Sequence, residues 1–197
     1  MKTKIKISIL FGRVCAILLG MTNFTALCED LRQNVLRLHI VANSNSQKDQ
    51  DLKLKIRDEI LKETGNLFLN TDNLYEAEKT AEDSLEIFED IANRVIKEEG
   101  FDYKATVSLG DQFFETRHYE TFSLPAGTYR SLIIKLGKAE GKNWWCVIFP
   151  SICVPTSSSD LRQSVSQNSA QIAEHSGNYI VRFKIVEIYE KIKRAIS

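Results

Sequence analysis

Apolar and polar residues alternate along residues 36–43 of the chain. A period of two is typical of a β-strand with one apolar face, which here carries Leu36, Leu38 and Ile40. The polar cluster at residues 43–46 follows directly and predicts a turn from this strand into a helix.

A helix is predicted from Ser46 to about Glu63. Ser46 and Asp49 stand three residues apart, which resembles a capping box with Asp in place of the usual Glu. Apolar residues recur every four positions on one face of this helix, at Leu52, Ile56 and Ile60. Asp49, Lys53 and Arg57 have the same spacing, and we interpret this series first as a row of structural salt bridges.

Residues 74–96 have apolar side chains spaced by threes and fours, which predicts one long amphipathic helix ending near Gly100. The following residues return to a period of two. Residues 103–109 and 113–119 flank Gly110-Asp111 and predict a β-hairpin.

Two more strands are predicted at residues 129–136 and 144–149, and together these elements indicate an α+β fold. Residues 156–178 are rich in Ser, Gln and Asn, which is typical of a flexible insertion. Helical spacing then returns, and we expect a terminal helix whose apolar stripe docks on the same sheet. Its members are Ile185, Ile188, Tyr189, Ile192 and Ile196.

The first residues have the layout of a secretory signal, with lysines before an apolar stretch at residues 7–21. This stretch is shorter than the roughly 20 residues that a membrane-spanning helix needs, and Arg13 interrupts it. Ala26 and Cys28 are small residues at a separation that suits cleavage before Glu29. We therefore expect a signal peptide at residues 1–28 and a single domain at residues 29–197; an uncleaved segment that tethers the domain to the membrane is the alternative.

Removal of the leader changes the charge of the protein. The full chain has 26 basic and 26 acidic residues, and the leader contains four of the basic residues and none of the acidic ones, which leaves a net charge of −4. An acidic domain without a basic stripe argues against a nucleic acid as the partner. Of the four cysteines, Cys146 and Cys153 remain, and an even pair in an exported chain predicts a disulfide.

Motifs for the common enzyme classes are missing from the sequence. The three histidines lack the spacing of a zinc motif, and we find no nucleophile elbow, phosphate-binding loop or dinucleotide fingerprint. We expect no metal, no cofactor, no small-molecule substrate and no enzymatic activity. The alternative is an exported cysteine hydrolase acting on cell wall or peptide, in which Cys146 pairs with His39 or His118.

Trp144 and Trp145 are neighbours on a predicted strand, so that their rings point to opposite faces. An exposed tryptophan beside a rigid disulfide loop would anchor a protein partner. Burial of both rings under a loop or the terminal helix is the alternative.

Several blocks of the sequence together form a specific pattern. The blocks are Leu36-Arg37-Leu38-His39-Ile40-Val41-Ala42-Asn43-Ser44, Asp49-Gln50, Leu52-Lys53, Lys55, Arg57-Asp58, Leu124-Pro125-Ala126-Gly127-Thr128-Tyr129, Gly141-Lys142-Asn143-Trp144-Trp145-Cys146-Val147-Ile148-Phe149-Pro150 with Cys153, and Val181-Arg182-Phe183-Lys184. This pattern resembles the stage II sporulation protein R family, and the similarity covers nearly all of the chain after the leader.

The resemblance implies a signalling role during endospore formation. Such a protein is secreted from the forespore into the space between the two membranes, where it activates a membrane-embedded aspartic protease of the mother cell. The protease then removes the pro-sequence of the mother-cell sigma factor. The family provides no agreed catalytic residues, so none is assigned here, and the oligomeric state stays open.

An activator needs a surface that recognises its receptor, and two regions join polar or aromatic groups to a fixed backbone. Our hypothesis places this surface in one of the two. The first is the turn from strand to helix, with His39, Asn43, Ser44, Asp49 and Arg57. The second is the loop from Trp144 to Cys153, with Trp144 and Trp145.

Overall fold

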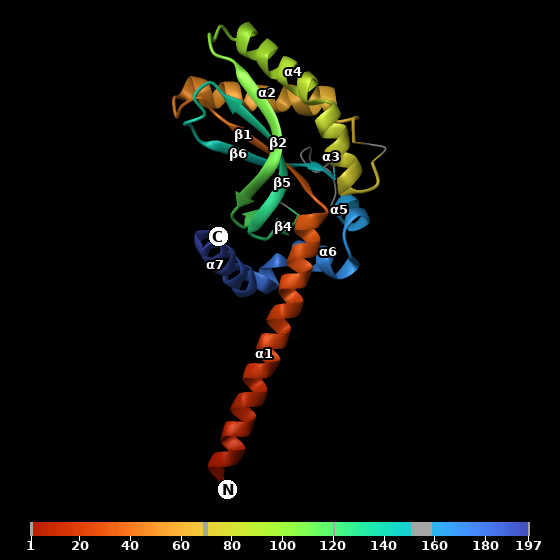
Figure 1. Ribbon diagram of the computed structural model, residues 1–197, viewed down its shortest axis with the longest axis vertical. Coiled ribbons are helices and arrows are strands. Elements are labelled where there is room, and N and C mark those ends of the chain that lie inside the picture. The colour runs from red at the N-terminus through yellow and green to blue at the C-terminus, as the bar shows by residue number, and fades with distance from the viewer. Residues whose placement is uncertain (1, 69–70, 120, 151–158, 197) are drawn as a thin grey trace.

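The computed structural model describes residues 2–68, 71–119, 121–150 and 159–196. The α+β fold expected from the sequence is confirmed (Figure 1). Its centre is a sheet in the order β2-β5-β1-β6, in which β1 is parallel to β5 while β2 and β6 are antiparallel to their neighbours. The strands are β1 (Leu36–Val41), β2 (Ala105–Phe114), β5 (Gly127–Leu136) and β6 (Asn143–Phe149), and a two-stranded ribbon is formed by β3 (Arg117–His118) and β4 (Ser123–Leu124).

One face of the sheet is covered by α2 (Gln47–Thr64), α3 (Leu74–Asp83) and α4 (Leu85–Glu98) (Figure 1). We call it the helix-covered face. The predicted apolar residues of the first strand and helix meet there in one apolar core. Its members include Leu36, Leu38, Ile40, Leu52, Ile56, Ile60, Phe88, Ala92, Leu132, Ile134 and Ile148.

The opposite face, called here the aromatic face, carries a second buried cluster. It is built against α1 (Lys2–Gln33), α5 (Ser159–Ser164), α6 (Gln167–Glu174) and α7 (Ile180–Ile196), with a short 3-10 turn at Ser176–Tyr179. The cluster contains Phe24, Cys28, Leu31, Phe114, Tyr129, Val147, Ala173, Phe183 and Val186. The chain therefore has apolar packing on both faces of its sheet.

The hairpin predicted around Gly110-Asp111 does not form. Strand β2 runs straight through these residues and pairs with β5 over ten positions, from Ala105 with Leu136 to Phe114 with Gly127. Gly110 lies opposite Ser131 inside this ladder. The turn signal was overridden because a long partner strand satisfies the backbone groups of the whole segment.

The helix predicted at residues 74–96 is divided at Ser84 into α3 and α4. The backbone of Ser84 is non-helical, with φ −110° and ψ 9°. In contrast, Ser46 is confirmed as the N-cap of α2, since the backbone N–H of Asp49 donates to Ser46 Oγ at 3.2 Å. The second bond of a capping box is not made to Asp49, because the backbone N–H of Ser46 donates to Ser44 Oγ at 3.0 Å.

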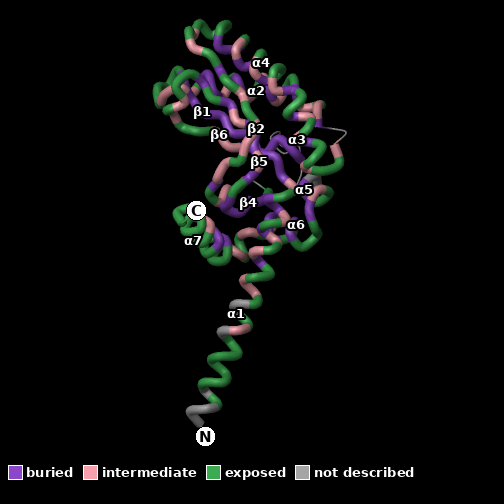
Figure 2. Tube along the Cα trace, viewed as in Figure 1, coloured by how far each residue is buried: buried purple, intermediate pink, exposed green. Residues whose placement is uncertain are grey.

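Helix α1 continues past the expected cleavage position. Phe24 and Cys28 are 2% and 0% exposed, and the Phe24 ring contacts Phe183 at 5.3 Å between centroids. The earlier part of α1 projects away from the domain and is mostly exposed (Figure 2). Within the described part of the chain, no helix combines the length and apolar character needed to cross a membrane.

The polar segment 156–178 differs from the expected insertion. From Ser159 onward it is largely helical, with α5 and α6 separated at residues 165–166, and Ala170, Ile172 and Ala173 of α6 are buried. Residues 156–158 lie outside the described part. Helix α7 also differs from the expectation, because Phe183 and Val186 face the domain while the predicted docking stripe faces outward.

Candidate functional site

The turn between β1 and α2 is organised around the carboxylate of Asp49. Asn43 Nδ2 and Tyr103 Oη donate to it at 3.1 and 2.6 Å, and the hydroxyls of Ser44 and Ser46 also donate. Burial alone would raise the pKa of Asp49, but these hydrogen bonds, led by the one from Ser44, outweigh it and lower the pKa. Asp49 therefore fixes the turn as an ionised carboxylate.

The same turn is joined to the loop between β5 and β6. The backbone N–H groups of Lys138 and Lys142 donate to the side chains of Asn43 and Asn45, each at 2.9 Å. A Cβ on Gly141 would lie 2.2 Å from the backbone oxygen of Ser44, so only glycine permits this approach. Three of the predicted partner-binding residues, Asn43, Ser44 and Asp49, thus hold the framework of the turn together.

Arg57 lies on the same helix as Asp49, α2, but takes no part in the described hydrogen bonds of the Asp49 carboxylate. Its guanidinium carbon lies 4.3 Å from the centroid of the Trp144 ring, a cation–π contact, and it forms an ion pair with Asp58 at 2.6 Å. The predicted salt-bridge row does not form as such, because Lys53 bonds to Gln50 and the backbone of Lys142. The contact joins the two candidate regions, since β6 pairs with β1 and places Trp144 opposite Ile40.

His39 and Trp145 stand opposite each other in the neighbouring strands β1 and β6, on the aromatic face. Their rings stack with centroids 3.9 Å apart and planes 14° apart, and the Phe114 ring contacts Trp145 at 4.6 Å. Burial lowers the pKa of His39 to about 4, the Asn143 amide opposes this shift, and the charges of Lys135 and Arg37 reinforce it. His39 is therefore a neutral ring at pH 7.

Arg37 is the main residue of this face that the sequence analysis did not single out. Its side chain is 0% exposed and its guanidinium carbon lies 3.9 Å from the Phe114 centroid. Nη2 donates to Tyr119 Oη at 2.6 Å, while Nη1 has no hydrogen-bond partner among the described residues. Arg117 also approaches this face, 5.7 Å from the Trp145 centroid. The sequence pattern that points to Arg37 is strand alternation, which places Arg37 on the same side of β1 as His39.

The geometry separates Cys146 from His39. Cys146 lies opposite Leu38 and belongs to the core under the helix-covered face, whereas His39 points to the aromatic face. His118 instead bonds through Nδ1 with Ser123 Oγ at 2.8 Å. This arrangement disfavours a thiolate–imidazole pair. Cys153 lies outside the described residues, so the disulfide stays a prediction.

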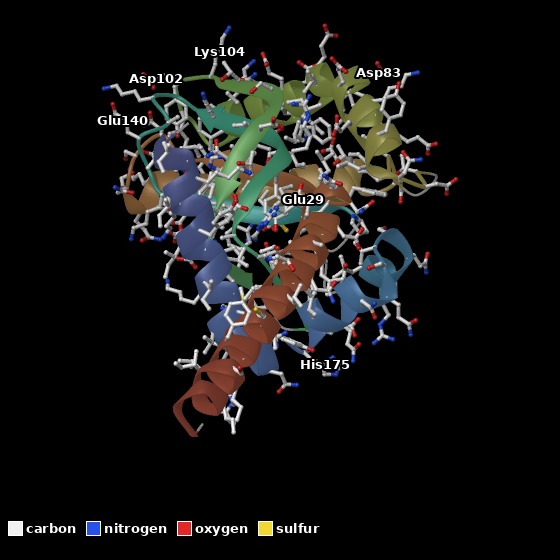
Figure 3. All side chains as sticks on the ribbon, turned by 60° about the horizontal axis from the view of Figure 1, so that its bottom comes forward. Glu29, Asp83, Asp102, Lys104, Glu140 and His175 are labelled. Carbon is white, nitrogen blue, oxygen red and sulfur yellow. The ribbon has the colours of Figure 1, made fainter. Side chains whose placement is uncertain are left out.

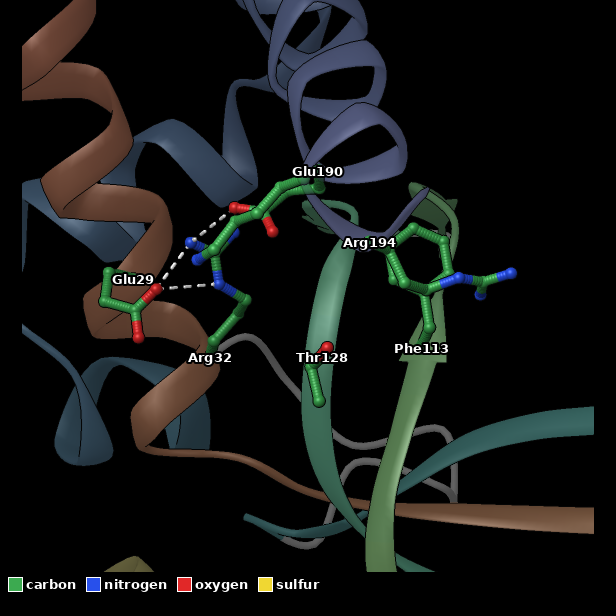
Figure 4. A pocket seen from close by; sticks show the side chains of 7 residues that line it. Glu29, Arg32, Phe113, Thr128, Glu190 and Arg194 are labelled. Atoms are coloured by element: carbon green, nitrogen blue, oxygen red, sulfur yellow. Dashed lines mark hydrogen bonds and ion pairs between the residues drawn. The ribbon is translucent and has the colours of Figure 1, made fainter. Parts of the chain in front are cut away.

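A small pocket lies between α1, α7 and the ends of β2 and β5 (Figure 4). Arg32 occupies its wall, where it forms ion pairs with Glu29 at 2.5 Å and Glu190 at 3.4 Å and donates to the backbone oxygen of Ala126. Because the charge of Arg32 is already paired with Glu29 and Glu190, we interpret the pocket as a structural contact between α1 and α7 and not as a binding site. Among the residues that the structure describes, no group of three or more His, Cys, Asp or Glu side chains could hold a metal ion.

The pocket is at a different place on the molecule from the two candidate regions, which adjoin each other at β1 and β6. Figure 3 shows Glu140, in the loop beside the Asp49 network, at the far side of the domain from His175 at the end of α6. Glu29 lies between them, on α1. The sequence-predicted residues His39, Asn43, Ser44, Asp49, Arg57, Trp144 and Trp145 therefore form one region around β1 and β6, although on both faces of the sheet.

Two comparisons with known proteins point to the same family for the central part of the chain. The model of the family described as stage II sporulation protein R matches residues 32–159. Stage II sporulation protein R of Bacillus subtilis strain 168 is 36% identical over 118 residues, which are 60% of this chain and 53% of that protein. The chain thus spans about half the length of this curated relative. No solved structure matches.

Proposed function

Because the chain belongs to the stage II sporulation protein R family, which gives it a role in sporulation, we propose that it is a secreted signal that activates a membrane-embedded aspartic protease. The protease of the mother cell would then process the sigma factor precursor. The observation that carries this proposal is the extent of the family match. Residues 32–159 include the whole sheet, α2 to α4 and all seven predicted partner-binding residues.

An activator shifts its receptor only by the difference between its affinities for the two receptor states. A rigid surface provides such a difference at low entropic cost. The region around Arg57 and Trp144 suits this role, because the network of Asp49 fixes the backbone beside it. The Arg57 side chain remains 19% exposed and is accessible to a partner.

The proposed route to the receptor is export through residues 1–28, with release into the space between the two membranes. Cleavage before Glu29 would remove Phe24 and Cys28 from the second buried cluster, whereas an uncleaved chain would keep them and stay tethered. N-terminal sequencing of the protein recovered from sporulating cells separates these forms. Detection of the intact chain alone would refute release by cleavage before Glu29.

The test of activation is reconstitution with purified components. Membranes containing the protease and the sigma factor precursor are incubated with and without this chain. Processing is followed by the increased mobility of the shortened sigma factor on a denaturing gel. We expect processing only when the chain is present. Equal processing in its absence would refute the proposal.

The surface is tested with a matched pair of variants. Arg57→Gln removes the contact with Trp144, and Arg94→Gln is the control because Arg94 also lies on a helix and pairs with a carboxylate, that of Glu63. We expect Arg57→Gln to raise the concentration for half-maximal processing by about fivefold or more, and Arg94→Gln to leave it unchanged. Equal effects of the two variants on this concentration would show that Arg57 is not part of the recognition surface.

We further propose that Cys146 and Cys153 form a disulfide after export. The two described thiols outside this pair are Cys15 and Cys28, both in the expected leader. A cleaved and oxidised chain would therefore show no reactive thiol after unfolding. One or two reactive thiols in the cleaved protein would contradict the bond.

A further inference from the structure

The outward face of α7 is apolar along its length. At about 100° per residue, the exposed apolar side chains from Val181 to Ile196 fall within one sector of roughly 100°, and Ile180 at the start of the helix lies outside it. Phe183 and Val186 lie on the opposite side and are buried in the domain. The exposed members of the sector are Val181 at 72%, Ile185 at 45%, Ile188 at 51%, Tyr189 at 55%, Ile192 at 54% and Ile196 at 81%. Helix α7 thus has two apolar faces, of which the domain covers one.

Basic residues border the outward stripe on both sides. Lys184 and Lys191 follow one edge, and Arg182 and Lys193 follow the other. Glu187 and Glu190 lie on the domain side, where Glu187 binds Lys184 at 2.9 Å and Lys191 at 3.1 Å. Lys191 also forms an ion pair with Glu115 at 2.7 Å. The side chains of Lys184 and Lys191 nevertheless remain 64% and 46% exposed. Long basic side chains at the edges of an apolar stripe can reach polar headgroups while their stems stay in apolar surroundings.

The stripe continues onto α1. A groove between the two helices is lined by Met21, Thr25 and Ala26 of α1 and by Ile185 and Tyr189 of α7. Beyond the groove, α1 exposes further apolar residues, among them Phe11 at 70% and Leu19 at 71%. Helices α1 and α7 lie on the same side of the sheet, and Figure 3 shows them at an angle to each other, close together near the start of α7 and apart at its end. The apolar surface thus spans two helices at one end of the molecule.

We propose that α7 lies flat on an anionic lipid surface, with its outward stripe in the boundary between headgroups and acyl chains. An apolar sector with cationic borders is the pattern of interfacial helices, which are attracted by anionic lipids and anchored by apolar side chains. A protein partner would not require cations along both edges. The match to the family model covers residues 32–159, so α7 lies outside the matched residues.

The experiment measures the depth of one position in the membrane. Tyr189→Trp is introduced in the full-length chain, and vesicles of phosphatidylglycerol with brominated acyl chains serve as the quencher. The signal from Trp144 and Trp145 is subtracted with the parental chain. We expect a loss of roughly half of the added emission, because interfacial helices bury their apolar face about 5–10 Å deep.

Ile87→Trp provides the matched control. Ile87 is 49% exposed on α4, over the helix-covered face, and its added emission should not be quenched even when α1 binds the same vesicles. Vesicles of phosphatidylcholine should quench position 189 less, and Lys184→Gln with Lys191→Gln should reduce the affinity by roughly fivefold for each lysine.

Three outcomes would overturn the proposal. The first is the absence of quenching at position 189, and the second is equal quenching at positions 87 and 189. The third is a stable dimer without lipid that Ile188→Asn converts to a monomer in sedimentation velocity, since the stripe would then be a contact between two copies of the chain.

Discussion

The two faces of the sheet are both buried, but by different means. On β1, Leu36, Leu38 and Ile40 enter the apolar core of the helix-covered face, while Arg37 and His39 enter the aromatic face. The first set gains free energy directly from removal of apolar surface from water. The second set buries a charge and an imidazole, which costs free energy unless aromatic faces and hydroxyls compensate. One strand thus separates residues stabilised by apolar burial from residues whose burial depends on aromatic and hydroxyl partners.

The apolar face should show the largest effect on stability. We expect Leu38→Ala to lower the free energy of unfolding by about 3 kcal/mol, because a fully buried side chain leaves a cavity. Urea unfolding measures the change, with the exposed Ile87→Ala as control. A loss of unfolding free energy as small as that of the control would show that the covering helices move in to fill the cavity left by Leu38→Ala.

The aromatic face should make stability depend on pH through His39. Its pKa is about 4 in the folded protein and about 6.5 when unfolded, so the unfolded chain takes up the proton first. The contribution of His39 to stability is fully present well above pH 6.5 and is lost as the pH falls toward 4. The two pKa values set an upper limit of about 3 kcal/mol, which solvent screening of the partly accessible ring reduces to about 2 kcal/mol. His39→Gln should remove this decrease in urea unfolding between pH 7 and 4.

His118→Gln is the control for this pH dependence, since His118 is exposed and bonds to Ser123. An unchanged slope in His39→Gln, or the same change in both variants, would show that His39 titrates normally.

Removal of the Tyr119 hydroxyl, which accepts a hydrogen bond from Arg37, should have an intermediate effect on the free energy of unfolding. Tyr119→Phe leaves Nη2 of a buried guanidinium without its acceptor, and we expect a loss of about 1.5 kcal/mol. Thermal or urea unfolding measures this loss against Tyr75→Phe, whose ring is 76% exposed. No difference between the two variants would mean that water replaces the hydroxyl.

Replacement of the buried charge itself should have the smallest effect. Arg37→Met keeps much of the side-chain volume and removes the desolvation cost, so the free energy of unfolding should change by less than about 1 kcal/mol. The same variant should impair processing of the sigma factor precursor if the aromatic face contributes to signalling. A loss above about 3 kcal/mol would instead make Arg37 as important for stability as Leu38.

Part of the candidate site could be predicted from the sequence because its determinants are local. The spacing of Ser46 and Asp49 predicted the cap of α2, and alternation predicted β1. The contact of Arg57 with Trp144 could not be predicted in this way, since it joins residues 87 positions apart through the pairing of β1 with β6. Arg37 was passed over for the same reason, because Phe114, Tyr119 and Tyr129 reach it only in the folded chain.

The sequence by itself determined the α+β class, the positions of β1, β5 and β6 and the apolar side of β1, because hydrophobic periodicity acts within one element. Only the tertiary structure decided that β2 continues through Gly110-Asp111 and that residues from Ser159 onward are largely helical. It also decided which stripe of α7 is buried: periodicity identifies an apolar face, but the contact surface is chosen by competition between faces. Phe183 and Val186 pack in the domain, and Ile185, Ile188 and Ile192 remain at the surface.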